Sequence, residues 1–157
     1  MSAEERLVHA AGPPAGAVLL RGARALDPRA ELDRPADVLV RDGRVAELGE
    51  SGALDAPAGA EVVDAEGLIA LPAFVDPHVH LRTPGREDEE DIDSGTRAAA
   101  AGGFCAILAM PNTDPVVDSA PVLRSLRERA RAEARVPTGF LAAITRGQRA
   151  PGGRRHP

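Results

Sequence analysis

The sequence predicts an α/β fold in which a small β unit precedes the first strands and helices of a parallel sheet. Two observations support this. Over residues 17–70, short apolar runs are separated by turns rich in Gly, Pro and Asp, which is typical of β-structure. Over residues 71–145, apolar runs of strand length alternate with helix-like segments, which is the pattern of a parallel α/β sheet. Residues 1–16 and 146–157 fit neither pattern.

The β unit is predicted from three apolar runs, at residues 17–26, 37–49 and 61–71. The second run contains an Asp42-Gly43 pair between alternating apolar residues, which is a strong signal for a β-hairpin. Residues 1–16 are rich in Pro and Gly without a periodic pattern, so we expect a loose lead-in.

The second part of the chain alternates strands with helices. The expected strands, all apolar runs, lie at 71–81, 104–110 and 139–145. Four consecutive Ala within residues 94–103 favour a helix that Gly102-Gly103 ends. Asp118 or Ser119 is expected to cap a second helix with Pro121 in its first turn. Its apolar face carries Leu123, Leu126 and Ala130.

Composition excludes several classes of protein. The chain has 157 residues, of which 43% are hydrophobic and 27% charged, close to ordinary globular usage for about one domain. A net charge of -5 argues against a general nucleic-acid-binding surface. No apolar run reaches the roughly 18 residues of a membrane span, and the N-terminus lacks a secretory layout. We therefore expect a soluble cytoplasmic protein that binds neither nucleic acid nor membrane.

The single cysteine has a limited set of roles. Because Cys105 is the one cysteine of the sequence, the chain cannot form an intramolecular disulfide or an all-Cys zinc site. Because Cys105 lies in an apolar run, we expect it to pack in the core.

His78 and His80 stand two residues apart at the end of an apolar strand. The two-residue period of a strand places both imidazoles on one face, which suits two ligands of one metal ion. A His-x-His pair alone does not establish a metal site, but its context favours one. Asp76 and Pro77 precede the pair, and Arg82 follows on the same alternating face.

Three blocks of sequence together resemble the dihydroorotase branch of the cyclic amidohydrolases: DPHVHLRTPG (76–85), AAAAGGF (98–104) and AMPNTDPVVD (109–118). The resemblance runs from about residue 17 to about residue 147. It implies a metal-dependent (β/α)8 amidohydrolase barrel with a small β domain built partly from the N-terminal segment. Residues 71–145 would then form part of the barrel.

The resemblance implies roles for four residues. His78 and His80 would bind the metal, expected to be one or two zinc ions in a complete barrel. His80, Arg82 and Asn112 would bind the substrate, with Arg82 and Asn112 on its carboxylate. Without the resemblance, Arg82 would be a solvated loop charge and Asn112 a turn residue.

The implied reaction interconverts dihydroorotate and N-carbamoyl-aspartate in pyrimidine biosynthesis, through attack of a metal-activated hydroxide on a ring amide. A complete barrel takes about 250 residues. The expected catalytic Asp has no counterpart in this chain, and without Lys no carboxylated lysine can bridge two metals. We therefore expect a truncated, inactive portion of such an enzyme, by nature or through a frameshift or gene-prediction error.

Two other functions remain open. One is an allantoinase or hydantoinase, although the HLR and MPNT motifs favour dihydroorotase. The other is a non-catalytic partner of aspartate carbamoyltransferase, against which the presence of His78, His80 and Arg82 argues. The candidate partners are that enzyme and a second copy of the chain.

Some features depart from the family pattern or stand outside it. Ala73, Thr83 and Cys105 replace the Gly, the acidic residue and the Thr that are common in the family.

The acidic segment 86–93 is expected to be solvated, with carboxylates that favour the following helix N-terminus. Residues 146–157 are mostly Arg, Gly and Pro and are expected to form a disordered tail. Without aromatics to stack bases, they make a poor nucleic-acid patch.

Overall fold

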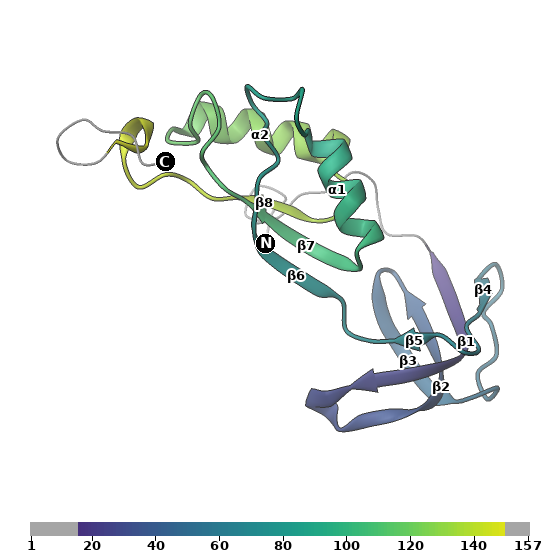
Figure 1. Ribbon diagram of the computed structural model, residues 1–157. Helices are drawn as coiled ribbons and strands as arrows, with labels where there is room; N and C mark the ends of the chain where they lie inside the picture. Colours follow the sequence, from purple (N-terminus) through teal and green to yellow (C-terminus); the bar gives the residue numbers. More distant parts are fainter. Residues whose placement is uncertain (1–15, 150–157) are drawn as a thin grey trace. The chain divides into compact units, whose positions relative to one another are not determined.

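The computed structural model describes residues 16–149, which form two compact units that meet in the sequence at Pro72 and Ala73 (Figure 1). Most of the expected lead-in, residues 1–15, and of the expected tail, residues 150–157, lie outside the described residues.

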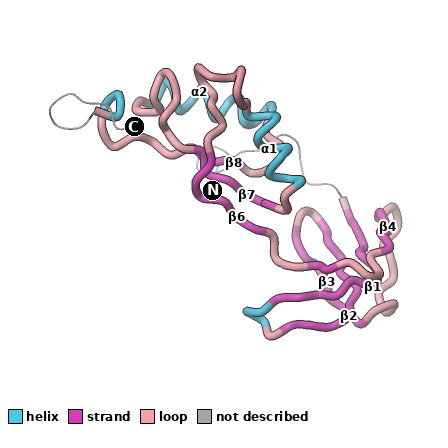
Figure 2. Tube along the Cα trace, in the orientation of Figure 1, coloured by secondary structure: helices cyan, strands magenta, loops and turns pink. Residues whose placement is uncertain are grey.

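The first unit is a five-stranded sheet, whose strands are magenta in Figure 2. Its strands are β1 (Ala17–Asp27), β2 (Leu32–Arg41), β3 (Arg44–Glu50), β4 (Glu61–Asp64) and β5 (Ile69–Ala70). The order is β3-β2-β1-β4, with β5 also paired to β1. Strand β2 is antiparallel to both β1 and β3, whereas β4 and β5 run parallel to β1.

The predicted hairpin is confirmed. Asp42 and Gly43 join β2 to β3 with φ of 51° and 72°, the left-handed values that a tight hairpin turn requires at both positions. The run at residues 61–71 is divided rather than continuous. A turn separates β4 from β5, closed by a 3.0 Å hydrogen bond from the Leu68 N–H to the Ala65 carbonyl.

A buried carboxylate, Asp37, holds this unit together. It accepts hydrogen bonds from the backbone N–H of Gly22 (2.9 Å) and of Leu54 (3.2 Å). Gly22, with φ of 73°, lies where the register between β1 and β2 shifts. A hydrogen bond from the Gly52 N–H is the main cause that lowers the pKa of Asp37, with smaller contributions from those of Gly22 and Leu54, against the opposing effect of burial. Asp37 therefore fixes the bulge and the loop after β3.

The second unit is a parallel sheet covered on one face by two helices (Figure 1). Its elements are β6 (Phe74–Val79), α1 (Ile92–Ala101), β7 (Phe104–Ala109), α2 (Ala120–Glu133) and β8 (Thr138–Phe140). The order β6-β7-β8 confirms the expected alternation of strands and helices, although β8 is shorter than the run at residues 139–145. The core between sheet and helices is aliphatic, as the composition predicts: Leu81, Ile92, Ile107, Ala109, Val117, Leu126, Ala130, Ala134 and Val136.

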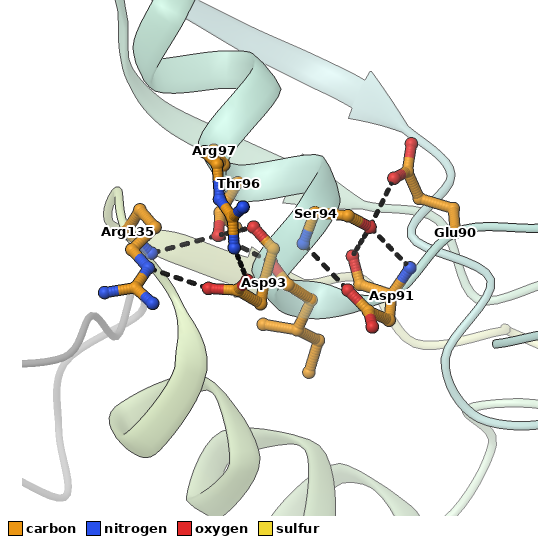
Figure 3. Close-up of polar contacts among 8 residues, drawn as sticks. Glu90, Asp91, Asp93, Ser94, Thr96, Arg97 and Arg135 are labelled. Carbon is orange, nitrogen blue, oxygen red and sulfur yellow. Dashed lines mark hydrogen bonds and ion pairs between the residues drawn. The ribbon is translucent and has the colours of Figure 1, made fainter.

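Helix α1 begins two residues before the expected run because Asp91 caps it. The Asp91 carboxylate accepts a 2.7 Å hydrogen bond from the Ser94 N–H, and the Ser94 hydroxyl accepts one of 3.1 Å from the Asp91 N–H (Figure 3). These hydrogen bonds form a capping box, and the Ser94 N–H is the main cause that lowers the pKa of Asp91. Gly102 ends the helix as predicted.

The start of α1 is tied to the segment after α2 (Figure 3). Nε of Arg135 lies 2.7 Å from Oδ1 of Asp93, and the Arg135 N–H donates a 2.9 Å hydrogen bond to the buried Thr96 hydroxyl. Since β8 follows at once, these contacts fix where the third strand enters the sheet.

Helix α2 buries the expected face and begins at the expected place, with Pro121 in its first turn, but without a capping hydrogen bond from a side chain. Leu126 and Ala130 are buried, and Leu123 packs against the same core. Ser119 occupies the N-cap position without a side-chain cap hydrogen bond. The Asp118 carboxylate instead accepts a 2.7 Å hydrogen bond from the Gly147 N–H, within the short 3-10 helix η3 (Arg146–Gln148). The first residues of the expected tail are thus bonded to the residue before α2, although Gly147 has a φ of 62°, outside the helical range.

Cys105 is exposed, which contradicts its expected place in the core. The register of β6 with β7 passes from Phe74–Phe104 to Val75–Ala106, so Cys105 is the extra residue of a bulge. A bulge interrupts the alternation of a strand, and the surrounding apolar run therefore does not bury the thiol.

Candidate functional site

The structure brings the two candidate metal ligands together at the carboxyl end of β6. His78 is in the strand and His80 follows its last residue, and their ring centroids lie 5.3 Å apart in an edge-to-face arrangement. Both side chains are exposed. The Asp76 carboxylate accepts a 3.0 Å hydrogen bond from the His78 N–H and so fixes the backbone across Pro77.

Asn112 meets His80 although 32 residues separate them. Nδ1 of His80 lies 2.9 Å from Oδ1 of Asn112. The neighbouring parallel strands explain this, because Val79 of β6 pairs with Ala109 of β7 and the Met110 N–H donates a 2.9 Å hydrogen bond to the Val79 carbonyl. The residues that follow the two strands therefore emerge side by side at one edge of the sheet.

Arg82 does not continue the alternation of β6, contrary to the expectation. Its φ of 57° is in the left-handed region, where the extended strand geometry has ended. Nε of Arg82 lies 3.2 Å from Oε2 of Glu89, a carboxylate that also pairs with Arg86. Within residues 16–149, the polar contact of the Arg82 side chain is with Glu89 and not with His80 or Asn112.

The loops that carry Arg82 and Asn112 are in close contact at Gly85. The Asp114 N–H donates a 2.9 Å hydrogen bond to the Pro84 carbonyl. Gly85 has φ of 105°, and a Cβ atom there would overlap the carbonyl oxygen of Asp114. Only glycine fits this position without strain.

The acidic segment is exposed over residues 86–89, as expected, but its carboxylates also have specific partners. Glu87 accepts hydrogen bonds from the Gly85 N–H (2.8 Å) and from Nη1 of Arg129 in α2 (3.0 Å). The Gly85 N–H is the main cause that lowers the pKa of Glu87, and Arg129 adds to it. Glu87 thus ties the loop after β6 to α2, and Glu89 links two arginines within that loop. Arg129 is 42 residues from Glu87, so the charge pattern alone did not reveal this pair.

The donor set fits part of a metal site. Imidazole nitrogens are common ligands of zinc and related ions, and two of them lie together here. Over the part of the chain that the structure describes, no three His, Cys, Asp or Glu residues gather as a potential metal cluster. His78 and His80 can therefore supply two ligands, with further ligands required to complete a tetrahedral shell.

Two further features lie near the candidate residues. His80 and Asp76 line an open cavity of about 290 Å³ whose other walls are mainly apolar. Next to Arg82, the Thr83 hydroxyl is buried and has no hydrogen-bond partner among the described residues.

No helix in residues 16–149 has the length and apolar character that crossing a bilayer requires.

A family model and the curated relatives of this chain agree on one family. A family model described as dihydro-orotase-like matches residues 67–152. The chain is 48% identical over 132 residues to a dihydroorotase of Geobacter sulfurreducens, covering 84% of this chain and 31% of that protein. It is 51% identical over 130 residues to a dihydroorotase of Solibacter usitatus, covering 83% and 30%. The chain thus spans less than a third of the length of these curated relatives.

Solved structures of cyclic amidohydrolases share the fold of this chain. L-hydantoinase (dihydropyrimidinase) from Arthrobacter aurescens superimposes with a TM-score of 0.68 at 25% identity, covering 80% of this chain and 27% of that chain. Dihydropyrimidinase from Brevibacillus agri superimposes with a TM-score of 0.66 at 28% identity, covering 87% and 28%. The β unit and the β6-β7-β8 sheet therefore have counterparts in larger enzymes.

Proposed function

Because the chain belongs to the dihydro-orotase-like family, whose model matches more than half of its residues, we propose that it carries the first metal ligands and the carboxylate-binding residues of a dihydroorotase. The proposed reaction interconverts dihydroorotate and N-carbamoyl-aspartate in pyrimidine biosynthesis. The contact between His80 and Asn112 is the observation that carries the proposal, because it joins a metal ligand to a substrate-binding residue at one edge of the sheet.

His78 and His80 are the proposed metal ligands, and zinc is the proposed ion. Such an ion, when bound, polarises a carbonyl and makes water a better nucleophile at neutral pH. Both imidazoles come from one strand end, where the backbone is held by Asp76 and by pairing with β7. The chain supplies these ligands on a rigid element, which favours a defined separation between them.

Arg82 and Asn112 are proposed to bind the substrate carboxylate. A guanidinium offers N–H donors in a planar fork that matches a carboxylate, and the Asn112 amide offers two more. Glu89 engages Arg82 through Nε, so the two terminal nitrogens remain as donors to a substrate. Packing at Gly85 keeps the two loops in contact, which supports a shared role for the two residues.

A hydantoinase-type activity is the second candidate. It is favoured by the solved structures described as hydantoinases or dihydropyrimidinases. Those substrates are also cyclic amides, so the same metal ligands would serve. Recognition of a carboxylate on the ring by Arg82 and Asn112 is the feature that favours dihydroorotate.

The test uses a chimera that continues this chain, after residue 149, with the corresponding remainder of a matched dihydroorotase. We expect metal-dependent turnover of dihydroorotate and little turnover of hydantoin. Preferential turnover of hydantoin would reject the first candidate in favour of the second. Co-purification of the 157-residue chain with aspartate carbamoyltransferase, without zinc binding, would support a non-catalytic partner instead.

The cellular setting is proposed on the same basis. A pyrimidine-forming enzyme would act in the cytoplasm on a small-molecule substrate. Aspartate carbamoyltransferase and a second copy of the chain are the proposed protein partners, and size-exclusion chromatography of the mixture would test both.

A further inference from the structure

We propose that Asn112 is a positioning residue for His80 as well as a substrate contact. Its Oδ1 accepts a hydrogen bond from the Nδ1–H of His80 and thereby selects the tautomer in which Nε2 is the nitrogen able to bind a metal. The inference rests on the proposed function, since it assigns a role to one contact within that site.

The first step is the chemistry of the two groups. A neutral imidazole has one N–H and one nitrogen lone pair, so its two nitrogens cannot have the same role. An amide has an acceptor, Oδ1, and a donor, Nδ2. At 2.9 Å from Oδ1, Nδ1 of His80 makes a hydrogen bond only when it carries the proton. Nε2 then keeps its lone pair.

The second step concerns the orientation of the amide. If the Asn112 amide were rotated, Nδ2 would face Nδ1, and His80 would carry its proton on Nε2. The proposed substrate contact decides between these two cases. A carboxylate only accepts hydrogen bonds, so Asn112 can bind it only through Nδ2. Oδ1 is then the atom left for His80, and one orientation serves both contacts.

The third step is that the backbone holds the pair in register. The pairing of Val79 with Ala109, and the hydrogen bond from Met110 to Val79, place His80 and Asn112 at the ends of adjacent strands. Metal-binding histidines in general donate their other ring N–H to an acceptor, which fixes tautomer and ring orientation. Asn112 fits that role.

Nitrogen NMR of the 157-residue chain, without metal, tests the proposal directly. At a pH above the ordinary titration range of imidazole, the ¹⁵N shifts and the couplings to ring protons report which nitrogen of His80 carries the proton. We expect the proton on Nδ1 in the wild-type chain and in Asn112→Asp, which keeps an oxygen acceptor. Asn112→Leu should move His80 toward the Nε2–H tautomer, with His78 as the internal reference.

Zinc binding by the chimera that continues this chain with the remainder of a matched dihydroorotase, carrying the same substitutions, gives a second readout. Asn112→Leu should weaken zinc affinity by about 10- to 100-fold, the range typical for loss of such a partner, while Asn112→Asp should not weaken it. A wild-type His80 protonated on Nε2, or zinc affinity equal in Asn112→Leu and wild type, would overturn the positioning role. The wild-type tautomer needs no substitution, so a variant that failed to fold would still leave that decisive measurement.

The failure of the proposed function gives a different result. In that case the wild-type chain would show the predicted tautomer, and its loss in Asn112→Leu, but replacing His78 and His80 by Ala would leave zinc binding by the chimera unchanged. That outcome would support the hydrogen bond and contradict the metal site.

Discussion

Nε of Arg82 lies 3.2 Å from Oε2 of Glu89, so a carboxylate of the acidic segment engages the candidate substrate-binding guanidinium. Both side chains are about two-fifths exposed, at 40% and 39%, and an ion pair of this kind adds roughly 0–1 kcal/mol to stability. The contact therefore matters more for the position of Arg82 than for the fold. It also leaves the terminal guanidinium nitrogens for a second carboxylate.

Replacement of Arg82 by Met should weaken substrate recognition without changing the metal site. Loss of a charge-assisted contact costs roughly 1.5–3 kcal/mol, or about 10- to 150-fold in kcat/KM. The measurement is dihydroorotate turnover by the chimera, with zinc content determined on the same sample. Arg86→Met is the matched control, since Arg86 pairs with the same Glu89 but has no proposed substrate contact. Wild-type kinetics in Arg82→Met would reject the role.

Gly85→Ala should destabilise the unit that contains the candidate site. A methyl group at this position meets the Asp114 carbonyl oxygen and also forces an unfavourable positive φ, which together should lower the free energy of unfolding by roughly 2–4 kcal/mol. Gly103→Ala is the control, because Gly103 has φ of 78° but its Cβ would have an ordinary 4.0 Å contact. It should lose only about 1 kcal/mol. Equal losses in urea unfolding would show that the two loops are not packed as described.

Asp37→Ala should destabilise the β unit by roughly 1–3 kcal/mol, because it leaves the partly buried N–H groups of Gly22 and Leu54 without their acceptor. Asp33→Ala is the control in the same strand, since Asp33 lies in an exposed pair with Arg24 and its loss should have a much smaller effect. Urea unfolding of both variants at neutral pH measures the difference. Equal stability of the two variants would contradict the role of Asp37.

Asp37 should also make stability depend on pH. Its pKa in the folded state is lowered by hydrogen bonds from the Gly52, Gly22 and Leu54 N–H groups, so the unfolded chain binds a proton more readily. The stabilisation is therefore complete above the ordinary carboxyl range and is lost as pH falls from about 5 through the lowered folded pKa. Asp37→Asn should flatten this part of the unfolding profile. An unchanged slope would contradict the assignment.

Local signals in the sequence predicted the parts of the fold that depend on neighbours along the chain. The Asp42-Gly43 turn needs only the backbone freedom of its own residues, and the end of α1 uses the same freedom at Gly103, whose φ is 78° just after the C-cap Gly102. Asp37 lies between apolar residues, and nothing in that pattern shows which N–H groups surround it. The bulge that exposes Cys105 likewise depends on pairing with β6.

In the candidate site too, local spacing could be predicted from the sequence, whereas contacts between distant segments could not. His78 and His80 were predicted from their spacing, since a strand places alternate residues on one face. The contact of His80 with Asn112 depends on the pairing of two strands about 30 residues apart, as does the closeness of Gly85 to Asp114. The pairing of Glu89 with Arg82 could not be predicted from the sequence, because the acidic segment has several carboxylates and the sequence does not show which of them faces Arg82.

The 157-residue chain alone should not turn over dihydroorotate. Its described residues bring together two imidazoles, and a catalytic zinc site uses three protein ligands in typical enzymes. The chimera, assayed at the same protein concentration and with added zinc, is the positive control. Zinc-dependent turnover by the 157-residue chain would show that its own residues complete the site.

Zinc titration of the chimera and of its His78→Ala, His80→Ala double variant tests the central claim most directly. If the two histidines at the end of β6 are metal ligands, calorimetry should show loss of at least one tightly bound zinc per chain in the double variant. Circular dichroism of both proteins should remain the same, which excludes unfolding as the cause. Unchanged zinc stoichiometry and affinity in a folded double variant would contradict the claim.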